Sequence, residues 1–297
     1  TVLSGSRAGA KGGFTALSAM ANTSPVADTA GVVEQVYRLG QAAGLLDVFP
    51  IGAVTQGLKG QTLSEIGAMA DSVAQVRVFS DDGNCVSDPL VMRRALEYIK
   101  KFGGVIAQHA QDPRMTIGSQ MNEGAVSSRL GLKGWPAVAE EAIIARDVLL
   151  ADHVQSRLHI CHLTTAGGVE IIRWAKARGI NVTAEVTPHH LLLTDDLASS
   201  YDPIYKVNPP LRTQKDVHAL REALADAGRG RGLFREPGRP DGRRASGRVR
   251  AHGPLPSGRA GAGGGQRRHD GRLHPRPVPI GHPEPPRPLG SVGAHGG

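Results

Sequence analysis

The chain has 297 residues, enough for one large domain or two of ordinary size, and a formal net charge of +8. The charge is uneven: residues 228–297 hold 14 Arg, no Lys and 4 acidic residues, which leaves −2 on the first 227 residues. These numbers argue against a nucleic-acid-binding fold, a membrane span of roughly 20 apolar residues and a disulfide framework, since only two cysteines occur and neither lies in a CxxC motif.

Short apolar runs alternate with longer amphipathic segments over the first 227 residues. Six runs that are apolar on both faces predict parallel strands covered by helices, at residues 14–21, 47–55, 75–80, 104–109, 157–162 and 181–187. Apolar residues at three- and four-residue spacing predict helices at residues 31–45, 88–102, 136–154 and 167–179. Repeated βα units of this kind predict a parallel sheet, either doubly wound or closed into a barrel.

The pattern ends after Asp226. In residues 228–297, 18 Gly, 11 Pro and 14 Arg make up 43 of 70 residues, which leaves few apolar side chains to offset the entropy of ordering. We predict a disordered basic tail without a stable fold. A second hypothesis is that GC-rich DNA is translated out of frame here, because Lys disappears while Arg, Gly and Pro dominate.

Polar residues follow the predicted strands. They are Asn22, the pair Asp81 and Asp82, His109, His162, residues 185–190 and, further along, Asn208. In a βα barrel the active site lies at the carboxyl ends of the strands, so this placement favours a catalytic barrel.

Two histidines and an aspartate form a ligand set that suits Zn²⁺. His109, His162 and one carboxylate of the Asp81–Asp82 pair are the candidates, and the sequence alone does not say which aspartate faces the metal and which caps a turn. His189 and His190 are weaker candidates, since they could equally line a pocket or lie in a loop.

The segment LHICH, residues 158–162, offers more than one ligand. Strand alternation puts Leu158, Ile160 and His162 on one face and His159 and Cys161 on the other. Because His162 also lies nearest the carboxyl end of the strand, we predict that it binds the metal and that His159 and Cys161 are packing residues.

Several segments of residues 1–226 together resemble the bacterial type I dihydroorotases of the amidohydrolase superfamily. They are MANTSPVAD, VRVFSDDG, IAQHAQDP, GWPAVAEEAIIARD, HICHLTTAGGVEIIRWAK and AEVTPHHLLLTDD followed by YKVNPPLR. The resemblance implies a (β/α)8 TIM-type barrel with Asp82 as the metal-bridging aspartate and His109 and His162 as metal ligands. It also implies that Asn22 and Asn208 contact the substrate.

The same resemblance implies an activity. It is the reversible, zinc-dependent cyclisation of N-carbamoyl-L-aspartate to (S)-dihydroorotate in pyrimidine biosynthesis, with one or two zinc ions. It further implies a cytoplasmic enzyme without nucleic-acid or membrane partners, which forms a homodimer or associates with aspartate transcarbamoylase. The rival interpretations are a hydantoinase- or allantoinase-like amidohydrolase and a non-catalytic subunit that scaffolds aspartate transcarbamoylase.

Two family motifs do not occur in this sequence. They are the HxHxR motif of the first barrel strand and the DHAPH-type motif of the eighth, whose aspartate is the general acid and base. From this departure we expect residues 1–227 to form an incomplete barrel that lacks its first and eighth strands. We accordingly expect a fragment, truncated at its amino terminus, without catalytic activity of its own.

Overall fold

A computed structural model describes residues 1–226 of the chain. Residues 227–297 lie outside the described residues. The predictions of a disordered tail and of an out-of-frame translation both fall on this segment. All structural statements below concern residues 1–226.

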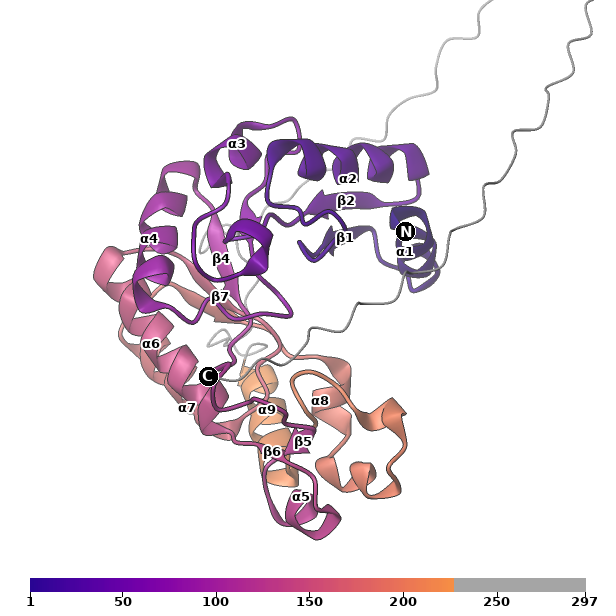
Figure 1. The fold of residues 1–297 in the computed structure, drawn as a ribbon, viewed down its shortest axis with the longest axis vertical. Helices are drawn as coiled ribbons and strands as arrows, with labels where there is room; N and C mark the ends of the chain where they lie inside the picture. Colours follow the sequence, from indigo (N-terminus) through magenta and orange to yellow (C-terminus); the bar gives the residue numbers. More distant parts are fainter. Residues whose placement is uncertain (227–297) are drawn as a thin grey trace, which may run out of the picture. The chain divides into compact units, whose positions relative to one another are not determined.

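Six short parallel strands follow one another in chain order (Figure 1). They are β1 (Ala16–Ala19), β2 (Asp47–Pro50), β3 (Val78–Phe79), β4 (Val105–Gln108), β7 (Leu158–Ile160) and β8 (Val182–Ala184). β1 pairs with β2, and β3, β4, β7 and β8 form one sheet in that order. A parallel bridge between Gly52 and Phe79 connects the two sets. All six predicted strands are present, each shorter than its apolar run, and their order excludes the reversal that a doubly wound sheet requires.

Four helices match the predicted amphipathic segments. They are α2 (Ala30–Ala43), α4 (Pro89–Ile99), which continues as the 3-10 turn η2 (Lys100–Phe102), α6 (Val138–Val154) and α7 (Ala166–Ala177). Asp88 caps α4, because its carboxylate accepts hydrogen bonds from the backbone N–H groups of Leu90 and Val91. No helix within residues 1–226 combines the length and the apolar character that a membrane crossing requires.

The remaining elements were not predicted. They are the helices α1 (Val2–Lys11), α3 (Ile66–Asp71), α5 (Ala125–Leu130), α8 (Pro188–Leu192) and α9 (Gln214–Asp226), the 3-10 turns η1 (Gln56–Leu58), η3 (Asp195–Ser200) and η4 (Pro203–Tyr205), and the strands β5 (Met121–Asn122) and β6 (Gly134–Trp135). β5 and β6 pair only with each other, in the excursion between β4 and α6. Both lie outside the apolar runs of the sequence, which is why the sequence did not reveal them.

The core lies between the four-stranded sheet and the helices α4, α6 and α7. Leu158 and Ile160 of β7 are at most 1% exposed and belong to this core, together with Ile106 of β4. The intervening positions project from the other face of the sheet, where Ala107 pairs with His159 and His159 with Thr183. One face of the sheet is therefore apolar and covered by helices, while the other carries polar side chains.

Candidate metal centre

The two adjacent aspartates after β3 have different tasks. Asp81 is 2% exposed and accepts hydrogen bonds from the backbone N–H groups of Val54 and Thr55, at 2.8 and 3.0 Å, and from the Thr55 hydroxyl. Burial raises the pKa of Asp81, and these hydrogen bonds oppose the shift. Asp81 thus holds the loop after β2, and Asp82 is the carboxylate that turns towards the histidines.

Asp82, His109 and His162 meet where β3, β4 and β7 end. The Oδ1 atom of Asp82 lies 3.2 Å from Nε2 of His162 and 3.4 Å from Nδ1 of His109, and the two ring nitrogens lie 3.0 Å apart. The rings stand nearly perpendicular, with an interplanar angle of 79°. The neighbouring side chains of His109 and then His162 hold the pKa of Asp82 well below its usual range, so it remains an anion at neutral pH.

A second contact orients His109. Its Nε2 atom lies 2.7 Å from Oε1 of Gln111, whose amide in turn donates to the hydroxyl of Thr116 at 2.8 Å. An amide oxygen can only accept, so Nε2 of His109 carries the proton and Nδ1 keeps its lone pair for the cluster. This arrangement is typical of histidines that bind metals.

The route by which His162 reaches the cluster differs from the predicted one. β7 ends at Ile160, and the chain then turns, with a φ of +35° at His162. The alternation that places His162 on the face of Leu158 and Ile160 is therefore wrong, because those two side chains enter the core while the His162 ring lies beside His109.

His159 and Cys161 were predicted to be packing residues. Cys161 is indeed buried, at 3% exposure, and this burial raises the pKa of its thiol well above the usual value. His159 instead has polar contacts: Nδ1 lies 2.8 Å from the Thr183 hydroxyl and Nε2 lies 3.5 Å from Oε2 of Glu185. His159 is therefore largely buried and is held by polar contacts within the sheet as well as by packing.

His190 connects α8 to the segment that contains Asn208. It is 2% exposed, and its two ring nitrogens lie 2.7 Å from the Thr187 hydroxyl and 3.2 Å from the carbonyl oxygen of Pro209. Burial lowers the pKa of His190 to about 4. Both ring nitrogens are engaged in the fold, which favours a structural role over metal ligation.

Asn22 and Asn208 lie in different surroundings. Asn22 is exposed after β1, and its amide nitrogen would lie 3.9 Å from a Cβ atom added to Gly83, next to Asp82. Asn208 is exposed and precedes the cis bond to Pro209. Asn22 thus lies near the turn that follows Asp82, and a substrate contact for either asparagine stays a prediction.

A buried polar network beside the cluster was not predicted. Arg212, 1% exposed, donates hydrogen bonds to the Thr164 hydroxyl at 3.0 Å and to the Asn122 side chain at 2.9 Å. The carboxylate of Glu140, 2% exposed, accepts from the backbone N–H groups of Thr164 and Thr165 at 2.9 and 3.1 Å. The sequence offered one signal for this network, because Glu140 lies among apolar residues of the predicted helix at residues 136–154.

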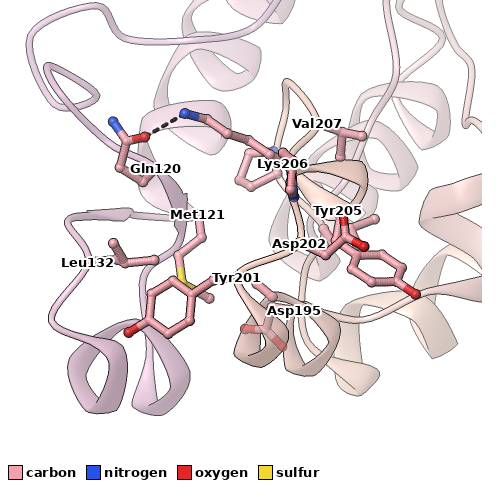
Figure 2. A pocket seen from close by; sticks show the side chains of 13 residues that line it. Gln120, Met121, Leu132, Asp195, Tyr201, Asp202, Tyr205, Lys206 and Val207 are labelled. Carbon is pink, nitrogen blue, oxygen red and sulfur yellow. Dashed lines mark hydrogen bonds between the residues drawn. The ribbon is translucent and has the colours of Figure 1, made fainter.

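A cavity of about 220 Å³ lies between the β5–β6 excursion and residues 195–211 (Figure 2). Gln120, Met121 and Leu132 line it from the excursion, and Tyr201 and Tyr205 line it from the other segment. The amine of Lys206 donates to the side-chain oxygen of Gln120 across its edge. None of the residues of the cluster lines this cavity.

Comparison with known proteins identifies relatives of this chain. Residues 1–167 match the family model described as dihydro-orotase-like. Three similar curated relatives are the dihydroorotases of Leifsonia xyli subsp. xyli, 75% identical over 226 residues, Streptomyces coelicolor, 73% identical over 226 residues, and Mycobacterium tuberculosis, 59% identical over 222 residues. These alignments cover 75–76% of this chain and 52–53% of the relatives. The chain therefore spans about half the length of the curated relatives it matches.

Solved structures share the fold at lower identity. The L-hydantoinase (dihydropyrimidinase) from Arthrobacter aurescens aligns with a TM-score of 0.61 and 23% identity, over 77% of this chain and 51% of that chain. A D-hydantoinase structure aligns with a TM-score of 0.57 and 18% identity, over 78% and 51%. Residues 1–226 thus have the α/β fold of about half of each hydantoinase chain. Since the family model matches more than half of its residues, the chain belongs to the dihydroorotase-like family.

Proposed function

We propose that this chain belongs to a zinc-dependent dihydroorotase, which reversibly cyclises N-carbamoyl-L-aspartate to (S)-dihydroorotate in pyrimidine biosynthesis. The convergence of Asp82, His109 and His162 from three neighbouring strands carries the proposal. The identity of 75% to the Leifsonia xyli dihydroorotase supports the choice of substrate. The parallel order of the six strands supports their assignment to a (β/α)8 barrel.

The three side chains fit a zinc ion. A tetrahedral ion that binds nitrogen and oxygen at about 2 Å requires ligand atoms roughly 3.3 Å apart. The three separations in this cluster are 3.0, 3.2 and 3.4 Å. Asp82, His109 and His162 would hold the ion, and bound zinc would supply a Lewis acid that polarises the amide carbonyl and lowers the pKa of a water molecule to about 7.

The remaining residues of the site bind and orient. Gln111 holds His109 in the tautomer whose Nδ1 atom is free for the metal. Asp82 supplies the negative charge that partly offsets the charge of the cation. In our proposal the amides of Asn22 and Asn208 form hydrogen bonds with the polar groups of the carbamoyl amino acid and hold it in an orientation suited to ring closure.

A chimera tests the proposal. The 226 aligned residues of the Leifsonia xyli dihydroorotase would be replaced by the matching residues of this chain, and the product assayed with N-carbamoyl-L-aspartate, hydantoin and allantoin. We expect zinc-dependent ring closure of the first substrate, and loss of both turnover and stoichiometric zinc in the Asp82→Asn and His162→Ala variants. A folded chimera that hydrolyses only hydantoin or allantoin would refute the assignment.

A further inference from the structure

We propose a second metal site, formed by His159, Cys161 and Glu185, that binds a soft divalent cation through a thiolate. One ligand atom from each of these residues lies within 4.8 Å of the other two. The site is distinct from the Asp82 cluster, shares no side chain with it, and does not depend on the function proposed above.

Strand register explains why these donors meet. In the parallel pair of β7 and β8, His159 lies opposite Thr183, and Ile160 lies opposite Ala184. His159 and Thr183 therefore project from the polar face of the sheet, and Cys161 and Glu185 follow just beyond the ends of the two strands. Backbone hydrogen bonds continue past the strand ends, from Glu185 N to Ile160 O at 3.1 Å and from Cys161 N to Gln108 O at 3.0 Å.

Neighbouring groups hold the donors in place. Nδ1 of His159 contacts the Thr183 hydroxyl at 2.8 Å, which leaves Nε2 facing Glu185 at 3.5 Å. One carboxylate oxygen of Glu185 accepts from the backbone N–H of His162 at 3.4 Å, and the other faces His159. An imidazole held at one nitrogen, with its other nitrogen facing a carboxylate, is the arrangement seen at metal ligands.

The donor set selects the kind of ion. Imidazole, thiolate and carboxylate all bind Zn²⁺, and the sulfur additionally favours softer ions over the hard ions that oxygen ligands attract. Cys161 is buried, whereas the side chain of Glu185 is 52% exposed and opens the site to solvent. On binding, the S–H bond breaks, a sulfur–metal bond forms, and the proton passes to the buffer.

Cadmium gives a direct test with the purified 297-residue chain. A cadmium–thiolate bond produces a charge-transfer absorption band in the ultraviolet, which the sulfur-free cluster of Asp82, His109 and His162 cannot give. We expect a band whose final amplitude corresponds to one cadmium–thiolate bond per chain and which disappears in Cys161→Ser. Cys85→Ser is the matched control, because the chain has only these two cysteines, and it should keep the band.

Three further variants examine the other two ligands and the hydroxyl that orients His159. His159→Ala and Glu185→Gln should weaken Cd²⁺ binding, and Thr183→Val should weaken it by about 10- to 100-fold through loss of the bond that orients His159. Circular dichroism verifies folding, and His159→Ala provides the test if Cys161→Ser does not fold.

The outcomes separate this site from the proposed function. No band in the folded wild-type chain, a band lost only in Cys85→Ser, or unchanged affinity in His159→Ala and Glu185→Gln would each overturn the second site. Asp82→Asn should leave the cadmium band intact while it removes zinc from the first cluster. If zinc binding survives when Asp82→Asn is combined with Cys161→Ser, which removes the second site, the proposed function is in error and the proposal of a second site is unaffected.

Discussion

Arg212 and Glu140 form a buried ion pair in which the guanidinium Nη2 atom lies 3.7 Å from a carboxylate oxygen. Their side chains are 1% and 2% exposed, and both contact Thr164, which lies two residues after His162. The pair therefore joins α6, the turn after β7 and the segment before α9, and stabilises the turn from which His162 reaches the cluster.

Removal of Arg212 should destabilise the fold strongly. Arg212→Met leaves the Glu140 carboxylate buried without its counter-charge, and breaking such a pair costs about 3–5 kcal/mol. Urea unfolding at neutral pH measures the change. Arg94→Ala is the control, because the Arg94–Glu97 pair lies on the exposed side of α4 and its loss should cost far less than loss of the buried pair. Equal losses of stability in the two variants would contradict the role given to the buried pair.

Gln111 should control metal affinity although it is not a ligand. Gln111→Leu removes the acceptor that fixes the His109 tautomer, and loss of such a partner lowers metal affinity by about 10- to 100-fold. Competition with a chromophoric chelator measures zinc affinity. Gln155→Ala, at an exposed position after α6, should bind zinc like the wild type. Unchanged affinity in Gln111→Leu would show that His109 needs no such support.

His190 should make stability depend on pH. Burial lowers its pKa to about 4 in the folded state from 6.5, so between these values the unfolded chain binds a proton that the folded chain does not. The free energy of unfolding should therefore fall as pH decreases from 6.5 towards about 4, by up to roughly 3 kcal/mol from this residue. Urea titrations at several pH values should show a shallower decline for His190→Gln. If the free energy of unfolding depends on pH equally in the wild type and in His190→Gln, His190 does not cause the decline.

Gly40 should be required for the packing of α2 on β2. A Cβ atom at this position would lie 2.5 Å from Cβ of Val48, so Gly40→Ala should destabilise the fold by about 1–3 kcal/mol although alanine favours helices. Gly31, in the first turn of the same helix, has no atom within 4 Å of an added Cβ, and Gly31→Ala should be neutral or stabilising. Thermal unfolding of both variants gives the comparison, and a stabilised Gly40→Ala would contradict the close approach.

The sequence was informative where long runs carried the signal. The apolar runs and amphipathic segments predicted six strands, four helices and the grouping of His109 and His162 with one carboxylate of the Asp81–Asp82 pair. The sequence was misleading where a strand ended early. We extended the alternation of strand faces through Cys161 to His162, although β7 ends at Ile160.

Contacts between distant segments could not be predicted. Nothing local indicates that Arg212 meets Glu140, or that Asp81 accepts hydrogen bonds from the loop after β2. Which of Asp81 and Asp82 faces the histidines depends on the backbone N–H groups of Val54 and Thr55, which lie in the loop after β2 and bind Asp81. Pairings of this kind are set by tertiary packing and leave no periodic pattern in the sequence.

The adjacent aspartates after β3 also bear on how mutational surveys of this chain would be interpreted. Substitutions at Asp81 leave two backbone N–H groups and a hydroxyl without their acceptor, so they should reduce the amount of folded protein in the cell. Substitutions at Asp82 remove no such anchor and should leave abundance near normal while they alter the chemistry of the cluster. A growth screen would score the two positions alike, and only a parallel measurement of protein abundance would distinguish the residue that maintains the fold from its neighbour that acts in the site.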